Sequence, residues 1–497
     1  MSASLMWLLD GITEVPQTDV QVVDLTLDSR EVRTGSLFLA LPGRTAHGVK
    51  FAAEAAARGA SAVLWEPTAD TAPPKLPKTV FAAAIPDLKN LAGRIADRFF
   101  NWPSSQLRIT GITGTNGKTT CAYLLAQCLE RLGLQAAYMG TIGWGRIGSL
   151  NPTALTTPDV VTLHRELAQL RAAGVRDVAM EVSSVALDQD RVAGVRFHTA
   201  AFTNLSRDHL DYHETMAAYG AAKARLFDAP DLRHIVVNVG DAFGREYAQS
   251  HAGSVPLTAV WIGPGDSGWL AERALRAADV TLNMHGMSLK LDGSFGRADA
   301  VTKLLGRFNA ENSLVVIACL LSLDISLADA VRVLAECKPP PGRMEVVEPA
   351  GADKPMAVVD YAHTPDALLK ALGALREHCQ GALWCVFGCG GDRDPGKRAI
   401  MGGIADEMAD EIIVTDDNPR SESPQAITRA IASGIKSRTA RVIHDRGEAI
   451  GAALREARAG DVVLIAGKGH EDYQIYGQTR RDFSDRREAQ RYLGVAA

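Results

Sequence analysis

Short apolar runs alternate with alanine- and leucine-rich stretches along most of the chain. In the last third, the runs 356–363, 382–391, 410–420 and 461–471 each contain an apolar stretch followed by polar or glycine residues. Between the first two lies "TPDALLKALGALREHC" (364–379), whose apolar spacing and leading threonine predict a capped helix. This alternation of strands and helices predicts α/β layers around largely parallel sheets.

Four polar loops follow the predicted C-terminal strands: "VDYAH", "GCGGDRDPGKR", "TDDNPR" and "AGKGHE". Ligands of open parallel sheets bind at the carboxyl ends of strands, so these loops are expected to share one sheet edge. In the third loop, Asp417 and Arg420 flank a rigid Asn-Pro turn. A surface turn with a local ion pair is one explanation, and a pocket for a ligand that carries both charges is the other.

Two proline-containing breaks divide the chain. They are "RFFNWPSSQ" (98–106) and "ECKPPPGRM" (336–344), where three prolines cannot continue the preceding helix. At 497 residues the chain is too long for one core. We therefore predict three domains, at 1–106, 107–340 and 341–497.

Composition narrows the class of protein. An apolar content of 46%, a charged content of 22% and a net charge of −5 are typical of a soluble globular protein and give no reason to expect a nucleic-acid partner. The seven cysteines form no CxxC pair, which argues against a disulfide framework or a zinc ribbon. The first residues lack a signal-peptide pattern, and no window approaches the ~18 apolar residues of a membrane span. We expect a cytoplasmic protein.

The segment "LRITGIT" (107–113), followed by "GTNGKTT" and the helix "CAYLLAQCLERLG" (121–133), has the parts of a phosphate-binding loop. Backbone N–H groups and the helix dipole face the anion, Lys118 adds a charge, and the Thr119 hydroxyl can reach a magnesium ion. The strict GxxxxGK[ST] spacing is not met, because position 112 is Ile. A glycine-rich turn with an unrelated lysine is the alternative.

Two further apolar runs end in polar residues, at "AMEVSSVALDQDRV" (179–192) and "AAFTNLSRDHLDYH" (200–213). Glu181 and His209 are expected at strand ends near the phosphates. One carboxylate together with phosphate oxygens suffices for Mg²⁺, which prefers oxygen ligands.

Taken together, "GTNGKTT", "MEVSS", "TNLSRDHLDYH", "GRFNAEN", "PGRME" and "VDYAHTPDAL" resemble the Mur ligase family of ATP-dependent amide-forming enzymes that build the peptidoglycan peptide. The region "LTLDSREVRTGSLFLALPGRTAHG" and the C-terminal loops are similar to the branch that adds the third residue, meso-diaminopimelate, to UDP-N-acetylmuramoyl-L-alanyl-D-glutamate (the UDP-linked dipeptide). The resemblance implies three α/β domains: a UDP-binding domain, a central P-loop ATPase-like domain with a mostly parallel sheet, and a C-terminal Rossmann-like amino-acid-binding domain. It also implies a cytoplasmic monomer.

The resemblance implies roles for matching residues. The ATP phosphates would be bound by Gly114, Thr115, Asn116, Gly117, Lys118, Thr119 and Thr120. The rest of the nucleotide would be held by Asn309, Arg343, Asp360 and His363. The metal set would be Thr119, Glu181, His209 and Lys223, with Lys223 carbamylated by carbon dioxide because an ammonium would repel Mg²⁺. Lys118, His209, Lys223 and Arg343 would take part in catalysis. Taken without the resemblance, Lys223 is an ordinary helix lysine.

The same resemblance assigns two binding sets. The UDP-linked dipeptide would contact Leu27, Ser29, Arg44, Thr45, Ala46, Thr156, Thr157, Ser183, Gln189 and Arg191. Diaminopimelate would contact Arg393, Asp417, Asn418, Pro419, Arg420, Gly467 and Glu471. In one respect the chain departs from the family, which often has His after "EVSS" where this chain has Val185.

Three alternatives stay open. A lysine-adding ligase of the same family is disfavoured by Arg420, which lysine-adding relatives lack. A folylpolyglutamate-type ligase gives no role to "LDSR…LPGR". A catalytically silent nucleotide-binding regulator would not need a second metal site.

Overall fold

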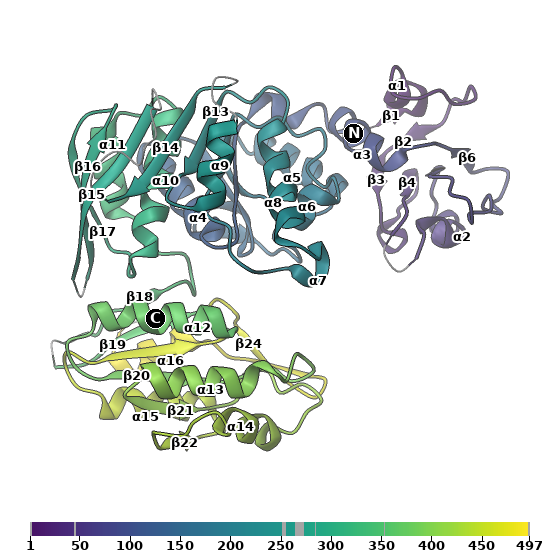
Figure 1. Cartoon of the computed structure of the whole chain (residues 1–497). Coiled ribbons are helices and arrows are strands. Elements are labelled where there is room, and N and C mark those ends of the chain that lie inside the picture. Colours follow the sequence, from purple (N-terminus) through teal and green to yellow (C-terminus); the bar gives the residue numbers. More distant parts are fainter. Residues whose placement is uncertain are drawn as a thin grey trace. The chain divides into compact units, whose positions relative to one another are not determined.

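The computed structural model describes residues 2–43, 46–250, 255–263, 273–283, 285–351 and 353–495. It divides into two compact units, residues 1–259 (unit 1) and 260–497 (unit 2), each described by itself. Figure 1 shows the elements along the chain. In these ranges we find no helix with both the length and the apolar character that a membrane crossing needs.

Unit 1 begins with a four-stranded parallel sheet. Its strands are β3 (Asp24–Thr26), β4 (Ser36–Ala40), β5 (Ala62–Trp65) and β6 (Phe81–Ala84). A small antiparallel pair and three helices accompany it: β1 (Ala3–Ser4), β2 (Gln21–Val22), α1 (Leu5–Leu9), α2 (Ala52–Ala57) and α3 (Leu88–Phe99). Successive β4 residues enter two different apolar clusters, Leu37 and Leu39 in one and Phe38 and Ala40 in the other, so both faces of this sheet are covered.

A second sheet of unit 1 has the order β10-β9-β8-β11-β7-β12-β13 and is parallel from β8 to β13. Its strands are β7 (Arg108–Thr113), β8 (Ala136–Gly140), β9 (Gly143–Arg146), β10 (Ser149–Asn151), β11 (Asp177–Glu181), β12 (Thr199–Phe202) and β13 (His234–Asn238). The accompanying helices are α4 (Lys118–Arg131), α5 (Val160–Ala172), α6 (Ser184–Asp188), α7 (Leu210–His213), α8 (Met216–Ala224) and α9 (Ala242–Ser250). Strand β14 (Leu257–Ile262) spans the division between the units.

Unit 2 opens with an antiparallel meander and two helices. These are β15 (Arg273–Asn283), β16 (Gly286–Gly293), β17 (Ala298–Thr302), α10 (Phe308–Ser322) and α11 (Leu327–Glu336). The serine before α11, Ser326, caps this helix by accepting a hydrogen bond from the Asp329 N–H group.

The C-terminal sheet has the order β18-β19-β23-β20-β21-β22, with β18 antiparallel at one edge and all other pairs parallel. Its strands are β18 (Glu345–Val347), β19 (Met356–Asp360), β20 (Leu383–Phe387), β21 (Glu411–Val414), β22 (Ala440–Val442) and β23 (Val462–Ala466). Its other elements are α12 (Pro365–His378), α13 (Lys397–Met408), α14 (Pro424–Ala432), α15 (Arg446–Glu456), α16 (Asp485–Leu493), β24 (Tyr473–Tyr476) and β25 (Thr479–Asp482).

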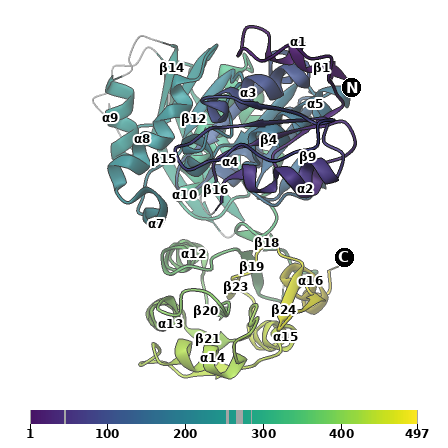
Figure 2. The same cartoon turned by 90° about the vertical axis from the view of Figure 1, so that its right-hand side faces the viewer.

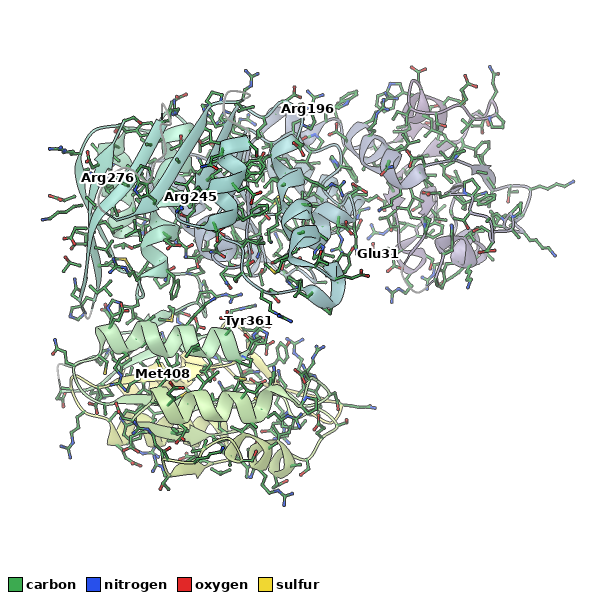
Figure 3. All side chains as sticks on the ribbon, viewed as in Figure 1. Glu31, Arg196, Arg245, Arg276, Tyr361 and Met408 are labelled. Atoms are coloured by element: carbon green, nitrogen blue, oxygen red, sulfur yellow. The ribbon has the colours of Figure 1, made fainter. Side chains whose placement is uncertain are left out.

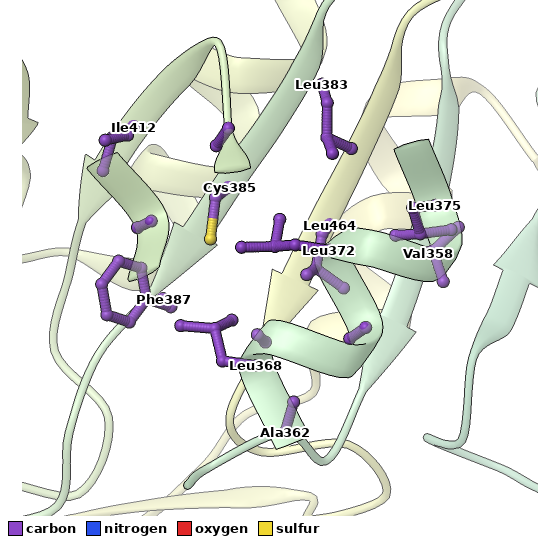
Figure 4. Close-up of a cluster of buried hydrophobic side chains, with 14 of the residues drawn as sticks. Val358, Ala362, Leu368, Leu372, Leu375, Leu383, Cys385, Phe387, Ile412 and Leu464 are labelled. Atoms are coloured by element: carbon purple, nitrogen blue, oxygen red, sulfur yellow. The ribbon is translucent and has the colours of Figure 1, made fainter. Parts of the chain in front are cut away.

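Helices cover both faces of this sheet, with α12, α13 and α14 on one side and α15 and α16 on the other (Figure 2). The strands supply alternate residues to the two cores. Cys385 and Phe387 enter the α12 side, which Figure 4 shows, whereas Trp384 and Val386 enter the other. This is the two-sided covering that a parallel sheet requires.

The fold class predicted from the sequence is confirmed: the central and C-terminal sheets are mostly parallel α/β sheets. The predicted helix at 364–379 is α12, capped by the Thr364 hydroxyl. Helix α4 begins at Lys118, three residues before the predicted start at 121, because Gly117 adopts a left-handed conformation (φ 86°) that lets "KTT" form the first turn. The predicted domain limits stay a prediction.

A close joint connects α3 to α5 and to the loop after α6 within unit 1. A Cβ on Gly93 would lie 2.3 Å from the Ala193 carbonyl oxygen, so only glycine fits there. Beside it, the buried Asp97 Oδ1 lies 3.5 Å from His164 Nδ1. Burial raises the pKa of Asp97 to about 6 and lowers the pKa of His164 to about 4. His164 Nε2 donates to the Ala193 carbonyl, so in the neutral ring Nδ1 is an acceptor.

We predict that Asp97→Asn stabilises the protein at pH 7 by about 1–3 kcal/mol, because the amide can donate to His164 Nδ1 and carries no charge. Because the pKa of Asp97 is raised on folding, its carboxyl does not reduce the stability at a pH below its pKa in the unfolded chain. It reduces the stability most above about pH 6, where it is ionised in the folded protein. The gain should therefore vanish as the pH falls toward 4. Urea denaturation of both proteins across this range measures it.

The matched control is Asp366→Asn, at an exposed carboxylate, which leaves Asp97 in place and should retain the pH dependence that Asp97 causes. An equal gain for Asp97→Asn at pH 4 and pH 7 would contradict the titration of a buried carboxyl as its origin.

Candidate functional site

The predicted phosphate loop connects β7 to α4. Gly114 has φ 148° and Gly117 has φ 86°, both in the region that favours glycine. A Cβ on Gly114 would lie 1.9 Å from Thr203 Oγ1, so no other residue fits. Lys118 Nζ folds back over the loop and donates to the carbonyl oxygens of Gly114 at 2.8 Å and Thr115 at 2.9 Å. The loop, the helix N-terminus and the ammonium group therefore converge, as an anion site requires.

The segment after β12 holds this loop in place. The Thr115 N–H group donates to the Asn204 carbonyl at 2.8 Å, and the Asn116 N–H group donates to Asn204 Oδ1 at 3.0 Å. In return, Thr203 Oγ1 donates to the Asn116 carbonyl at 2.6 Å. These three hydrogen bonds fix the loop against the segment that follows β12.

Glu181 is the last residue of β11, in register with Ile112 of β7. Its carboxylate is buried and accepts four hydrogen bonds. Oε1 accepts from the Tyr138 hydroxyl at 2.5 Å and the Thr141 N–H group at 2.8 Å, and Oε2 accepts from Thr119 Oγ1 at 2.8 Å and Thr141 Oγ1 at 3.2 Å. The sequence predicted Glu181 at a strand end near the loop, and the geometry agrees.

These groups suit a hard cation. The Thr119 hydroxyl and the Glu181 carboxylate are adjacent oxygen ligands beside an anion-binding loop, which is the donor type that Mg²⁺ prefers. Among the described residues there is no group of three or more His, Cys, Asp or Glu side chains arranged around a metal position.

Lys223, on α8, is almost entirely buried. Its Nζ donates to the Gly114 carbonyl at 2.7 Å and lies 4.3 Å from the centroid of the Tyr219 ring. Burial, followed by the charge of Lys118, holds the pKa of Lys223 well below its usual 10.5. Burial thus favours the neutral amine of Lys223 over its ammonium form, which is unlike the solvated helix lysine that the residue pattern alone suggested.

His209 lies in a different position from the one predicted. It does not end a strand but precedes the short helix α7, in a left-handed conformation (φ 51°). Its ring is half-exposed, and its centroid lies 6.0 Å from that of Tyr219. His209 and Lys223 both lie near the Tyr219 ring, and the Tyr219 hydroxyl hydrogen-bonds with Thr115 at 3.1 Å.

Five residues predicted to contact the peptide substrate belong to a hydrogen-bond network that begins beside Glu181. Thr157 Oγ1 donates to the Glu181 carbonyl at 3.0 Å and accepts from the Ser183 N–H group at 3.1 Å. Arg191 donates to the Thr157 carbonyl at 3.1 Å and through Nε to Gln189 Oε1 at 3.0 Å. The fifth residue, Thr156, shares a hydroxyl hydrogen bond with Thr141.

A cleft of about 530 Å³ near the start of the chain (the N-terminal cleft) includes two of the predicted UDP contacts, Leu27 and Ser29. Ser29 Oγ donates to Glu54 Oε2 at 2.9 Å. Ala46 is not among its lining residues, and Arg44 and Thr45 lie outside the described residues.

The carboxyl ends of the C-terminal strands enclose a cleft of about 700 Å³ (the C-terminal cleft). Six of the seven predicted diaminopimelate contacts line it: Arg393, Asp417, Asn418, Arg420, Gly467 and Glu471. Pro419 does not line it; its carbonyl instead faces Gly391, where a Cβ would lie 1.9 Å away. The cleft also contains the N-terminal turns of α12 and α13, through Thr364, Pro365, Gly396 and Lys397.

Arg420 is held by the neighbouring loop. Its Nη1 donates to the Gly391 carbonyl at 2.8 Å, and its backbone pairs with β24 through the Ile475 carbonyl at 3.0 Å. The two loops are joined further along, since Ser421 Oγ donates to Asp392 and the Asp392 N–H group donates to Glu422 at 2.6 Å. Asp417 and Arg420 are thus not ion partners on a surface turn.

Beneath the cleft lies a buried ion pair between Arg446 and Asp485, with Nε to Oδ1 at 2.6 Å and Nη2 to Oδ2 at 2.8 Å. Both side chains are fully buried. Arg446 Nη2 also donates to the Ala466 carbonyl at 2.9 Å and Nη1 to the Asp416 carbonyl at 3.4 Å. These carbonyls immediately precede Gly467 and Asp417, so the pair fixes the ends of two strands that line the cleft.

Arg343, Asp360 and His363 gather around Tyr361, which Figure 3 labels. The Arg343 guanidinium lies 4.9 Å from the Tyr361 ring centroid, and the His363 and Tyr361 rings are 4.5 Å apart. Arg343 Nε is buried and has no hydrogen-bond partner among the described residues. Burial raises the pKa of Asp360 and lowers that of His363.

Asn309 is not gathered with these three. It is buried near the start of α10, where it donates to the Leu305 carbonyl at 2.8 Å and accepts from Asn312 at 2.7 Å.

The sequence did not single out several residues that hold these sites together. Tyr138 and Thr141 bind Glu181, Tyr219 covers Lys223, and the buried Lys468 contacts Asn418 and Glu471. Thr141 directly follows β8, and Lys468 is the second residue after β23. These positions at strand ends could have drawn attention to them. Tyr219 has no such signal.

Comparison with known proteins gives a consistent result. The sequence matches the Mur ligase family catalytic domain over residues 21–99, the Mur ligase middle domain over 112–320, and the Mur ligase glutamate ligase domain over 342–469. A UDP-N-acetylmuramoyl-L-alanyl-D-glutamate–2,6-diaminopimelate ligase of Ectopseudomonas mendocina is 47% identical over 98% of both chains. A protein of the same name from Xanthomonas campestris pv. campestris is 49% identical over 94% of this chain and 93% of its own.

Among solved structures, one of a protein with that same name matches with a TM-score of 0.73 and 35% identity, covering 99% of both chains. The similarity therefore extends through all three sheets and is not limited to the nucleotide loop.

We predict that Gly391→Ala destabilises the protein by about 1–3 kcal/mol, because its Cβ would meet the Pro419 carbonyl at 1.9 Å and separate the two loops that hold Arg420. Urea denaturation measures the change. Gly396→Ala is the matched control, since its φ of −63° suits alanine and its Cβ approaches only the flexible Asp394 side chain. Equal effects of the two substitutions would contradict the close contact.

Proposed function

The chain belongs to the Mur ligase family, and we propose that it is the ATP-dependent amide ligase that adds meso-2,6-diaminopimelate to UDP-N-acetylmuramoyl-L-alanyl-D-glutamate in peptidoglycan precursor synthesis. The observation that carries this proposal is the C-terminal cleft, lined by Arg420 and by charges of both signs. Near-full-length identity to diaminopimelate ligases supports it.

The charges of the cleft fit this amino acid. Its charged lining residues comprise three cations and three carboxylates: Arg393, Lys397, Arg420, Asp394, Asp417 and Glu471. Diaminopimelate carries two ammonium groups and two carboxylates, so a ligand of mixed charge is complementary to such a lining.

Arg420 distinguishes diaminopimelate from lysine. One nitrogen of its guanidinium already donates to the Gly391 carbonyl, which fixes the direction of the group. The distal carboxylate of diaminopimelate can accept parallel hydrogen bonds from the guanidinium, while Glu471 takes the distal ammonium. Lysine has no such carboxylate and would leave the guanidinium without its partner, at a cost of about 1–3 kcal/mol.

ATP is assigned to the loop Gly114–Thr120 and to Asn309, Arg343, Asp360 and His363. The N-terminus of α4 and the adjacent Lys118 support phosphate binding. The unpartnered Nε of Arg343 supports an anionic ligand at that residue. We assign Mg²⁺ to Thr119 and Glu181, and a second ion to His209 and carbamylated Lys223. The ions supply positive charge that offsets charge on the phosphates.

The state of Lys223 supports its modification. Carbon dioxide reacts with a neutral amine, and burial disfavours the ammonium form of Lys223. The carbamate replaces a cation by an anionic oxygen ligand, N6-carboxylysine, which removes the repulsion between Lys223 and a metal ion.

The chain's residues stabilise charge in two steps. The D-glutamate γ-carboxylate attacks the γ-phosphorus of ATP, and ADP leaves, giving an acyl phosphate. The amine of diaminopimelate then attacks the acyl carbon, the tetrahedral oxyanion collapses, and phosphate leaves as the amine loses its proton. Lys118 and Arg343 provide fixed cations for the charge that develops on oxygen.

We further propose that residues 1–106, 107–340 and 341–497 are the UDP-binding, ATP-binding and amino-acid-binding domains, since each of the three family matches falls within one of these ranges. The UDP-linked dipeptide would contact the N-terminal cleft and the hydrogen-bond network of Thr156, Thr157, Ser183, Gln189 and Arg191. The enzyme is expected to act as a monomer in the cytoplasm, without a nucleic-acid partner.

The proposed reaction is tested with purified protein, ATP, the UDP-linked dipeptide, magnesium, bicarbonate and radiolabelled diaminopimelate or lysine. Label from diaminopimelate should enter the UDP-linked product with one phosphate released per amide. Preferred incorporation of lysine would favour the lysine-adding alternative, and activity only with a pterin substrate would favour the folylpolyglutamate type. Protein that binds ATP but releases no phosphate would be a silent regulator.

We predict that Arg420→Ala raises the KM for diaminopimelate by about 10- to 100-fold, because the distal carboxylate loses its partner, and leaves the KM for ATP within about twofold. Steady-state phosphate release with each substrate varied measures both. Arg429→Ala, on the exposed surface of α14, is the control and should change neither constant. A parallel rise in both constants for Arg420→Ala would indicate a folding defect and contradict the proposed role.

A further inference from the structure

Lys468 follows the glycine at the end of β23, and its side chain is fully buried. Its Nζ lies 3.0 Å from Glu471 Oε2 and 3.2 Å from Asn418 Oδ1, and 5.2 Å from the centroid of the Tyr473 ring. An ammonium is costly to bury unless acceptors surround it, so these contacts account for its position. The proposed function gives Lys468 no role.

The contacts of Lys468 determine how Asn418 is oriented. Asn418 Oδ1 accepts from two donors, Lys468 Nζ and the Ile475 N–H group, the latter at 3.0 Å. A flipped amide would turn its NH₂ group toward both donors, so only this orientation satisfies them. Asn418 Nδ2 is consequently directed at Glu471 Oε2, at 3.1 Å.

Glu471 is oriented by the same network. Its Oε2 accepts from both Asn418 Nδ2 and Lys468 Nζ, which holds this oxygen in place. Asn418 and Glu471 both line the C-terminal cleft, whereas Lys468 does not. Lys468 lies behind the lining, and its hydrogen bonds reach the cleft through these two side chains.

We propose that Lys468 is a positioning residue that sets the Asn418 amide and the Glu471 carboxylate in the geometry that receives the incoming amino acid. This inference rests on the proposed function, which places the amino acid in this cleft. A carboxylate held in advance by two donors does not have to be ordered when the ligand's ammonium arrives, so binding loses less conformational entropy.

The network also predicts which part of specificity Lys468 affects. The ammonium that Glu471 receives is present in both diaminopimelate and lysine, whereas Arg420 meets the carboxylate that only diaminopimelate has. Loss of Lys468 should therefore weaken the binding of diaminopimelate and of lysine by similar factors and preserve the preference between them. Loss of Arg420 should instead reduce the preference.

The test compares Lys468→Met with the wild type in the phosphate-release assay. We expect the KM for diaminopimelate to rise at least tenfold, the KM for ATP to stay within twofold, and the ratio of kcat/KM for diaminopimelate to that for lysine to stay within threefold. Lys370→Met is the matched control, since Lys370 pairs with Asp366 at 2.7 Å on the exposed face of α12, and it should leave all three quantities unchanged. An unchanged KM for diaminopimelate, or an equal rise for ATP, would overturn the proposal.

A double-mutant cycle tests whether Lys468 acts mainly through the Glu471 carboxylate. Lys468→Met should raise the KM for diaminopimelate at least tenfold in the wild type but less than threefold in a Glu471→Gln background, because Lys468 acts through that carboxylate. Additive effects would overturn the proposal. Wild-type protein that uses neither amino acid would refute the proposed function itself, which is a distinguishable result.

Discussion

The shared direction of parallel strands is the constraint on which the candidate sites depend. In the central sheet it brings the loop after β7 next to the end of β11, so that Thr119 meets Glu181. In the C-terminal sheet it brings the loops after β19, β23, β20 and β21 to one cleft. Segments far apart in sequence thus meet because hydrogen-bonded neighbours end together, and the same rule accounts for an anion site in one sheet and an amino-acid cleft in the other.

Convergence of polar loops also concentrates buried charge, and each site contains its own means of compensating for it. Glu181 accepts four hydrogen bonds, Arg446 pairs with Asp485 and two carbonyls, and Lys468 pairs with two side chains that line the cleft. These contacts hold rigid the groups that a ligand meets. Lys223 is different, since its neighbours disfavour its charged form, and it is the one lysine of the site for which a chemical modification is proposed.

The sequence predicted what periodicity and chain order determine: the α/β class, the capped helix α12, and the arrival of four polar loops at one edge. Six of the seven residues that it assigned to the amino acid line one cleft, while the ligands of both sites stay a prediction. It did not predict that Lys223 is buried, that α4 starts at Lys118, or that Lys468 supports Asn418 and Glu471. Apolar spacing assigns a residue to a face of an element, but burial of a polar group depends on partners from distant segments, such as Tyr219 for Lys223. His209 was placed wrongly because the polar run after β12 continues past the strand.

The contact between Gly93 and Ala193 limits how the N-terminal part of this protein can be exchanged for that of a relative. Two backbones touch at a point where neither Gly93 nor Gly194 tolerates a side chain, so the surfaces of α3 and of the loop after α6 are complementary. A chimera that exchanges the first hundred residues for those of another ligase would need a glycine at the matching helix position and a partner for His164. Recombination within the family is therefore limited at this joint by steric fit, even where both parents fold alike.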